Sequence, residues 1–306
     1  MADDLVYDHP DTSHLIDTAL REDLRFGDDL TCRALVPAEA GLAGVVRAKQ
    51  PGVICGLPVF RRVFAALGGG VVISEEAADG AVVRPGDVVL RFRGPAQVLL
   101  KGERTALNLA QRLSGTATVT RRFVEAVAGT AARILDTRKT TPGMRLLQKH
   151  AVAMGGGVNH RLGLYDAVLI KENHIALMPP GPLGSGPAEA VRRARASLGP
   201  QVLIQVEIEV LDDLEAVIAA GADLILLDNM VPEQISAAVR RRDAALAAPP
   251  VAGRRAQVLL EASGGLTLES VRSYALSGVD RLSIGALTHS VPALDLSMRC
   301  EPVRGG

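Results

Sequence analysis

The chain has 306 residues, 48% hydrophobic and 22% charged, and its 34 basic and 34 acidic residues give a formal net charge of zero. This composition is typical of a soluble globular enzyme, and the length suggests about two domains. No apolar run reaches the roughly 18 residues that span a bilayer, and the acidic amino terminus is unlike a secretion signal, so we expect a cytoplasmic protein. The neutral charge balance, the lack of Trp and the lack of a basic tract with interleaved aromatics argue against nucleic acid as the main partner.

The three cysteines, Cys32, Cys55 and Cys300, are odd in number and widely spaced, without a C-x-x-C pair. This spacing indicates neither a disulfide framework nor a zinc site. We interpret them as small apolar residues.

The first third of the chain mixes helical and strand patterns. Apolar residues at helical spacing alternate there with short apolar segments bounded by turn residues. The predicted elements are helices over residues 11–26 and 58–67 and strands over 44–48, 53–55, 71–73 and 88–90.

Residues 79–94 predict a β-hairpin, because two apolar runs flank the turn residues Pro85, Gly86 and Asp87. The segment looks like half of a lipoyl or biotinyl carrier. No lysine stands in or beside the turn to carry a prosthetic group, so we interpret it as a structural β-element.

A long helical pattern over residues 101–127 links the two halves of the chain. Arg104 stands in the first turn of this predicted helix, where a cation opposes the helix dipole. From the residues alone, Arg104 is therefore interpreted as a surface arginine.

From residue 133 onward, short β-rich runs alternate with helical patterns, the signature of parallel βα units. A closed barrel needs about eight units, and only six strands are clear, so we expect missed strands or an incomplete barrel. The strands are predicted at 133–136, 167–170, 202–206, 223–227, 257–260 and 280–284, and the helices at 144–154, 187–198, 211–220, 232–246 and 267–276.

Polar residues stand where these predicted strands end. In parallel βα folds the carboxyl ends of the strands face the ligand, so such residues converge on one mouth. Six strand ends in succession favour a functional site over ordinary caps and turns. The residues are Asp136 to Lys139, Lys171, Glu207, Asp228 with Asn229, Glu261 with Ser263, Gly264 and Gly265, and Ser283 with Gly285.

Residues 133–171 carry seven Lys or Arg against two acidic residues. A cleft lined by one sign of charge concentrates ligands of the opposite sign, which predicts an anionic ligand. The loops at 262–265 and 283–290 fit the place where such barrels bind phosphate on backbone N–H groups. The alternative interpretation of the basic run is a solvated face.

Glu207 and Asp228 are predicted to end adjacent strands. Together they could hold magnesium, which prefers oxygen ligands and bridges to substrate phosphates, or they could stabilise a positively charged sugar. His160 is interpreted as a ligand contact because it adjoins Arg161, whereas His174 fits a ligand role and a structural role equally well.

Six segments together closely resemble the quinolinate phosphoribosyltransferases. The resemblance covers nearly the whole chain in order, and the DTRKTTPG and GGGxNHRxGLYD motifs are highly specific. The segments are ERTALNLAQRLSGTAT (103–118), DTRKTTPGMR (136–145), GGGVNHRLGLYDAVLIKENH (155–174), LILLDN (224–229), EASGG (261–265) and SIGALTHS (283–290).

The resemblance implies an α/β protein in which an amino-terminal α/β sandwich domain precedes an incomplete, seven-stranded α/β barrel. The implied domains are 1–128, 129–290 and a segment, 291–306, that returns to the first domain. The implied reaction transfers phosphoribosyl from 5-phosphoribosyl-1-pyrophosphate to quinolinate with decarboxylation, as in NAD synthesis. Magnesium would be the cofactor, and a homodimer would share Arg104 across its interface.

The resemblance also assigns roles to single residues. Lys139, Glu207 and Asp228 would be catalytic, the two carboxylates also binding magnesium. The substrate-binding residues would be Arg104, Thr137, Arg138, His160, Arg161, Lys171, Ser263, Gly264, Gly265, Gly285 and His289. The chain departs from the family pattern at Gln148, His150, Ala153–Met154 and Gln205, and none of these departures removes one of the residues just named.

Three alternatives stay open at this point. A paralogous phosphoribosyltransferase-like protein of molybdate transport shares the fold, although the intact motifs favour the quinolinate enzyme. A Schiff-base lyase would use Lys139 or Lys171 as its amine. The third alternative is a non-catalytic anion-binding barrel.

Overall fold

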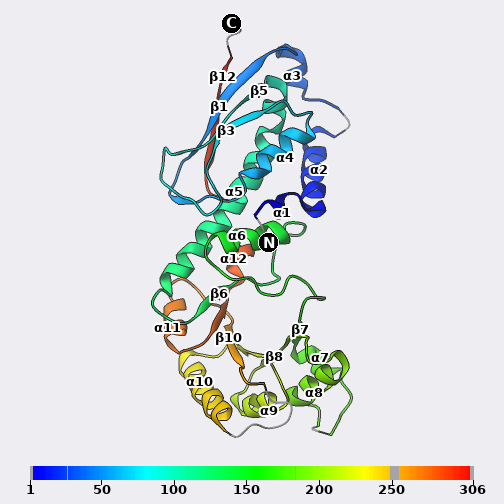
Figure 1. Cartoon of the computed structure of the whole chain (residues 1–306), viewed down its shortest axis with the longest axis vertical. Coiled ribbons are helices and arrows are strands. Elements are labelled where there is room, and N and C mark those ends of the chain that lie inside the picture. Colours follow the sequence, from blue (N-terminus) through cyan, green and yellow to red (C-terminus); the bar gives the residue numbers. More distant parts are fainter. Residues whose placement is uncertain (1–2, 26, 183, 249–254, 304–306) are drawn as a thin grey trace. The chain divides into compact units, whose positions relative to one another are not determined.

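The computed structural model describes residues 3–25, 27–182, 184–248 and 255–303 (Figure 1). The chain divides into two compact units. The first unit comprises residues 1–121, 139–157 and 286–306, and the second comprises residues 122–138 and 158–285. Among the described residues, no helix combines the length and the apolar character needed to cross a membrane.

The first unit contains a four-stranded antiparallel sheet in the order β12-β1-β5-β3. The last strand of the chain, β12, pairs along the whole length of β1, from Leu42 opposite Pro302 to Ala48 opposite Leu296 (Figure 1, red beside blue). Sequence analysis missed β12. The strands are β1 (Gly41–Ala48), β3 (Val72–Glu76), β5 (Val88–Pro95) and β12 (Leu296–Pro302).

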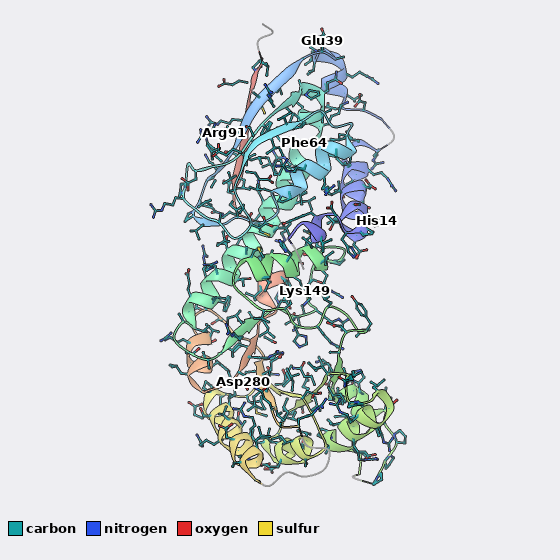
Figure 2. All side chains as sticks on the ribbon, viewed as in Figure 1. His14, Glu39, Phe64, Arg91, Lys149 and Asp280 are labelled. Atoms are coloured by element: carbon teal, nitrogen blue, oxygen red, sulfur yellow. The ribbon has the colours of Figure 1, made fainter. Side chains whose placement is uncertain are left out.

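Helices pack on this sheet through fully buried side chains. Helix α4 (Pro58–Ala66) begins with proline, whose fixed φ suits a first helical turn. Its Phe64 (labelled in Figure 2) lies 6.4 Å, between ring centroids, from Phe92 of β5 and closes the core from the helix side. The other helices of this unit are α1 (Asp3–Tyr7), α2 (Pro10–Leu24), α3 (Leu30–Leu35), α5 (Ala96–Ala126, its last residues in the second unit), α6 (Arg145–Met154) and α12 (Ala286–His289).

The predicted hairpin over residues 79–94 is wrong. Strand β4 (Val82–Val83) pairs with β2 (Gly52–Val53) and not with β5. The predicted turn between β4 and β5 does form, and in it the Asp87 carboxylate accepts a hydrogen bond of 2.8 Å from the backbone N–H of Arg84. Because β5 is already paired with β1 on one side and β3 on the other, it has no edge left for β4.

Helix α5 begins at Ala96, earlier than predicted, immediately after β5 ends at Pro95. Arg104 therefore lies inside the helix and not in its first turn, which corrects the dipole interpretation. The early start is explained by the stretch from Ala96 to Leu100, which contains four strong helix formers and no turn residue.

The second unit is built on a six-stranded parallel sheet in the order β6-β11-β10-β9-β8-β7. Helices α8 and α11 pack on it, the former against β7 and β8 and the latter against β11. The predicted βα repeat is confirmed. The strands are β6 (Arg133–Leu135), β7 (Val168–Ile170), β8 (Ile204–Ile208), β9 (Leu224–Asp228), β10 (Leu259–Ser263) and β11 (Arg281–Ser283).

Strands β6 and β7 are the two edges of this sheet, so the barrel is not closed. Val158 forms an isolated parallel bridge with Leu135 on the free side of β6, which supplies the seventh position. The incomplete barrel is thus confirmed. Its helices are α7 (Glu172–Ala176), α8 (Pro187–Leu198), α9 (Leu214–Ala219, preceded by a 3₁₀ turn at Leu211–Asp213), α10 (Pro232–Ala247) and α11 (Val271–Leu276).

Candidate functional site

The strand register places the predicted strand-end side chains on one face of the parallel sheet. Paired residues of neighbouring strands point to the same face, and the side then alternates along each strand. Ile170 pairs with Val206, so Lys171 lies level with Glu207. Ser263 pairs with Asp228, and both lie on the face of Glu207 because Glu207 pairs with Leu226.

We call the strand-end cluster the set of polar residues at this mouth of the second unit. Its residues lie in the strands β8, β9 and β10, in the segments that follow β6 and β7, and in the segment after Val158. Its members are Arg138, His160, Arg161, Lys171, Glu207, Asp228 and Ser263.

An ion pair joins Lys171 to Glu207, with Nζ 2.7 Å from Oε2. The side chain of Glu207 is 8% exposed and that of Lys171 is 45% exposed, so the pair is open to solvent from the lysine side. Burial raises the pKa of Glu207, and Asp228 adds to this, while Lys171 opposes it. For Lys171, burial lowers the pKa, but its hydrogen bond and charge interaction with Glu207 outweigh burial and leave it raised.

The ends of β9 and β10 are fixed to each other beside Asp228. The backbone N–H of Asn229 donates to the Ser263 carbonyl at 2.9 Å, and the Asn229 amide donates to the Asp228 carboxylate at 2.7 Å. Gly264 has a φ of +108°, and a Cβ there would lie 2.2 Å from the Asn229 side-chain oxygen. Only glycine fits this position, while Gly265 next to it is exposed and opens on free space.

Both the backbone and the imidazole ring of His160 have polar partners. The backbone N–H of His160 donates to the buried Asp136 carboxylate at 2.8 Å, and the ring Nδ1 accepts from the backbone N–H of Arg161 at 2.8 Å. The proton of the neutral ring therefore belongs on Nε2, which lies 3.4 Å from Glu261. His160 thus orients the segment that carries Arg161.

Glu261 is fully buried at the base of this arrangement. Burial raises the pKa of its carboxyl, but the interaction with His160, the hydrogen bond from the Ser283 hydroxyl and the charge of Arg281 outweigh burial and lower it. Glu261 therefore stays ionised beneath the mouth and gives His160 a fixed partner.

Two arginines of the strand-end cluster have buried donors left over. The Nε atoms of Arg138 and Arg161 are both buried and, within the described part of the chain, neither finds a hydrogen-bond partner. Arg161 does donate from Nη1 to the Ala167 carbonyl at 2.7 Å. Burial first, and the like charge of Arg138 second, lower the pKa of Arg161. An anion bound between the two guanidinium groups would satisfy both donors and relieve the repulsion.

The other residues singled out from the sequence lie as follows. Thr137 and Gly285 are half-buried at the ends of β6 and β11. Arg104, Lys139 and His289 belong to the first unit and are exposed there.

His174, left open by the sequence, is exposed, and its Nδ1 accepts from the backbone N–H of Lys171 at 3.0 Å. This hydrogen bond closes the first turn of α7, which is a structural role.

One functional candidate of the first unit was missed by sequence analysis. Gln148 is fully buried and hydrogen-bonded at both ends of its amide. Sequence analysis noted Gln148 as a departure from the family pattern, but a polar residue followed by Lys149 and His150 gave no signal that it is buried.

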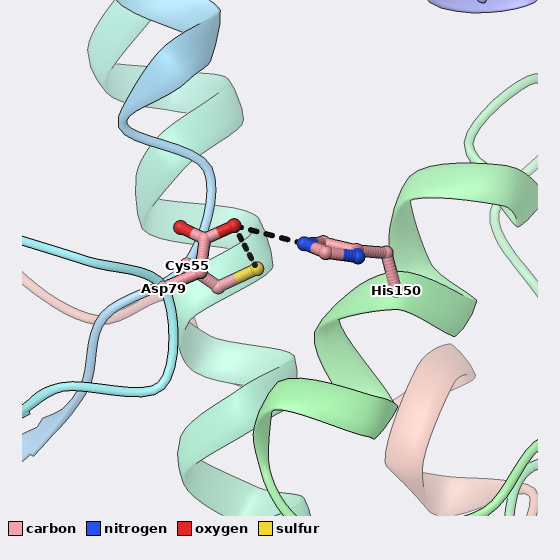
Figure 3. A group of neighbouring side chains, drawn as sticks. All are labelled: Cys55, Asp79 and His150. Atoms are coloured by element: carbon pink, nitrogen blue, oxygen red, sulfur yellow. Dashed lines mark hydrogen bonds and ion pairs between the residues drawn. The ribbon is translucent and has the colours of Figure 1, made fainter. Parts of the chain in front are cut away.

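Two places offer groups that bind metals. Glu207 and Asp228 end adjacent strands and present carboxylate oxygens on one face, which suits magnesium. In the first unit, donor atoms of Cys55, Asp79 and His150 lie within 4.8 Å of one another (Figure 3).

The second group, together with Tyr7, is called the Asp79 cluster here. The Asp79 carboxylate already accepts hydrogen bonds from His150 Nε2 at 2.8 Å, from the Tyr7 hydroxyl and from the backbone N–H of Gly56 at 2.9 Å. Its acceptors are satisfied by the protein itself. We therefore interpret the cluster as a structural hydrogen-bond network that holds α6 against the rest of the first unit.

Comparisons with known proteins show which family the chain resembles over both of its halves. Residues 29–114 match the model of the quinolinate phosphoribosyl transferase N-terminal domain, and residues 116–299 match that of the C-terminal domain. The chain is 46% identical to the nicotinate-nucleotide pyrophosphorylase [carboxylating] of Mycobacterium leprae, over 92% of this chain and 94% of that protein. A probable enzyme of the same name from Bacillus subtilis is 41% identical, over 95% and 93%.

Solved structures show the same similarity. The crystal structure of NadC from Streptococcus pyogenes has a TM-score of 0.85 and 35% identity, covering 95% of this chain and 96% of that one. The nicotinate-nucleotide pyrophosphorylase from Francisella tularensis has a TM-score of 0.83 and 34% identity, covering 98% of both chains.

Proposed function

The chain belongs to the quinolinate phosphoribosyltransferase family, and we propose how its residues carry out that family's reaction. The enzyme is a pentosyltransferase that joins phosphoribosyl from 5-phosphoribosyl-1-pyrophosphate to quinolinate. The products are nicotinate mononucleotide, pyrophosphate and carbon dioxide, in the synthesis of NAD. The family matches cover both halves of the chain.

The pair of unsatisfied arginines carries the assignment of the quinolinate site. Quinolinate has two carboxylates on adjacent ring atoms, and Arg138 and Arg161 have buried donors that find no partner among the described residues. Charge-assisted hydrogen bonds between guanidinium and carboxylate are among the strongest in proteins. Holding the diacid in this way fixes the pyridine nitrogen for attack, and such orientation is worth roughly 7–11 kcal/mol in favourable cases. Thr137 would line the same pocket.

Glu207 and Asp228 face the sugar in this proposal. As pyrophosphate departs, positive charge develops on the ribose ring, and two carboxylates already fixed on adjacent strands stabilise it. Glu207 is released for this role when Lys171, now 2.7 Å away, turns toward a substrate carboxylate or phosphate. Ser263, Gly264, Gly265, Gly285 and His289 would border the 5-phosphate.

Magnesium would be held by Glu207 and Asp228 together with the pyrophosphate of the substrate. The donor set fits, because both are carboxylates and hard cations prefer oxygen. When bound, the ion neutralises the charge of the leaving group.

Decarboxylation follows from the product of the first step. Once the pyridine nitrogen is quaternary, loss of the adjacent carboxylate leaves an electron pair beside a positive ring atom, and a proton then replaces the lost carbon dioxide. No organic cofactor is required. Lys139 lies directly after Arg138 in the chain and is assigned to the reacting centre and the pyrophosphate.

The Schiff-base alternative is disfavoured for Lys171. A Schiff-base lysine must be neutral to attack, whereas pairing with Glu207 raises the pKa of Lys171 and keeps it charged.

We propose that the enzyme works in the cytoplasm as a homodimer, or a multiple of one, in which the neighbouring chain supplies Arg104. The exposed side chain of Arg104, 63% accessible, suits a contact with a second chain.

The test is product analysis after incubation with quinolinate, 5-phosphoribosyl-1-pyrophosphate and magnesium. We expect nicotinate mononucleotide and carbon dioxide in equal amounts, with no product when any one component is omitted. Binding of quinolinate without release of carbon dioxide would instead support the anion-binding barrel.

A further inference from the structure

We propose that Gln148 is a positioning residue for this reaction and that its buried amide fixes the two segments carrying Lys139 and His289. The inference rests on the proposed function, since it assigns a purpose to the geometry around those two residues. All the groups involved belong to the first unit.

Gln148 lies on α6 and is 0% exposed. Its Oε1 accepts a hydrogen bond of 2.8 Å from the backbone N–H of Thr141, and its Nε2 donates to the backbone carbonyl of Thr288 at 2.9 Å. One side chain thus joins the loop after Lys139 to helix α12, although Thr288 is 140 residues away in the chain.

A third hydrogen bond completes this arrangement, and the three bonds that join Gln148, Thr141, Thr288 and Lys139 are together called the frame. The Thr288 hydroxyl donates to the backbone carbonyl of Lys139 at 2.8 Å, and Thr288 itself is 0% exposed. Lys139 and His289 are both exposed and stand at or next to residues of this frame. The frame is therefore buried, while the two charged side chains it carries face outward.

The frame needs an amide at position 148. A carboxylate of the same length would accept from Thr141 but could not donate to the Thr288 carbonyl, and it would bury a charge. An apolar side chain of similar size would satisfy neither backbone group. Helix α12 has only four residues, so few of its own backbone bonds hold it in place.

Helix α6 is a firm base for the frame. Two residues beyond Gln148, His150 bonds to Asp79 (Figure 3). The Asp79 carboxylate also accepts from the Tyr7 hydroxyl. Gln148 and His150 thus tie the same helix to different parts of the first unit. Because Lys139 and His289 are proposed to contact phosphate groups, displacing either residue should weaken binding of 5-phosphoribosyl-1-pyrophosphate and not binding of quinolinate.

The test uses Gln148→Met, which removes both amide bonds, and Thr288→Val, which removes the hydroxyl that donates to the Lys139 carbonyl and leaves the Gln148 amide in place. Thr288→Ser keeps that hydroxyl. The matched control is Thr12→Val, because Thr12 is 1% exposed and its hydroxyl also donates to a backbone carbonyl, that of Val6 at 2.7 Å. Circular dichroism and thermal unfolding establish that each variant is folded.

For Gln148→Met and Thr288→Val we expect kcat/KM for 5-phosphoribosyl-1-pyrophosphate to fall about 10- to 100-fold. Quinolinate affinity should stay within about 2-fold, Thr288→Ser should recover most of the activity, and Thr12→Val should lower stability alone. The double variant Gln148→Met/Thr288→Val should lose little more kcat/KM than Gln148→Met alone, since both changes disrupt the same frame.

An unchanged kcat/KM in folded Thr288→Val, or an equal loss of quinolinate affinity, would overturn the positioning role. If Gln148→Met does not fold, Thr288→Val still tests the proposal, because it is a smaller change that keeps the Gln148 amide and replaces a hydroxyl by a methyl group. A wild-type protein that forms no nicotinate mononucleotide would instead refute the proposed function, which separates the two failures.

Discussion

The Asp79 cluster and the strand-end cluster both gather charged and polar side chains, but they satisfy them differently. In the Asp79 cluster, His150, Tyr7 and a backbone N–H all donate to one buried carboxylate. In the strand-end cluster, Arg138 and Arg161 keep buried Nε donors that no described group accepts. A buried polar group that finds its partners inside the chain stabilises the fold, whereas one left without them needs a partner from outside the chain, which for two neighbouring guanidinium groups is an anion.

The largest effect is expected from removing the charges nearest the reacting atoms. Glu207→Ala and Lys139→Ala should each lower turnover at least about 100-fold, because each removes a charge proposed to stabilise the transition state. Initial rates at saturating substrate measure this. Near-normal turnover in either folded variant would remove that residue from the catalytic set.

Arg104 is proposed to act in the active site of the neighbouring chain, which mixing two inactive variants can test. Arg104→Ala and Lys139→Ala should each be nearly inactive alone, and mixing them should restore roughly a quarter of wild-type activity. The recovery arises because half of randomly mixed dimers contain one intact site out of two. Subunit exchange is followed with tagged chains; exchange without recovery would show that Arg104 does not act across an interface.

A smaller effect on activity, with almost none on stability, is expected for Arg161→Gln. Quinolinate KM should rise about 10- to 100-fold, since a hydrogen bond to a charged group is lost. The free energy of unfolding should change by less than about 1 kcal/mol, because the lost bond to the Ala167 carbonyl is offset by relief of repulsion from Arg138. A large destabilisation would mean that Arg161 serves the fold.

The opposite pattern is expected for Asp79→Asn, which should cost about 1–3 kcal/mol of stability and leave turnover of the folded enzyme unchanged. Burial raises the pKa of Asp79, but bonds from His150, Tyr7 and Gly56 outweigh it and hold the pKa below its ordinary 3.8. The unfolded chain therefore takes up a proton first as pH falls, so stability decreases below about pH 4. Urea titrations from pH 3 to 6 give the free energy of unfolding at each pH, and this free energy should decrease less steeply with falling pH in Asp79→Asn than in the wild type. An equal decrease in both proteins would refute the role of this carboxylate.

Much of the barrel could be predicted from the sequence because each strand is a short apolar run that ends in a charged residue or glycine. Lys171, Glu207 and Asp228 follow this rule, and the register places them together. The first unit was harder, since its strands pair across long separations. Strand β12 was missed and β4 was given the wrong partner, because neither run reveals which distant edge it joins.

The hydrogen-bond partners of individual side chains also could not be predicted from the sequence. The resemblance suggested His160 as a substrate contact, but only coordinates show its ring between Glu261 and the backbone of Arg161. Gln148 looked like a departure of little consequence until both ends of its amide were located.

The gap in the parallel sheet lies between the bridge at Val158 and strand β7, and the chain that crosses it, residues 159–167, carries Arg161. Within the described structure this segment has no ladder partner and is held by scattered bonds such as that from Leu162 to Asp166. Its amide protons should therefore exchange with solvent deuterium sooner than those of β8 to β10. If Arg161 binds quinolinate as proposed, the diacid is held by this segment, and bound quinolinate should slow amide exchange across residues 159–167.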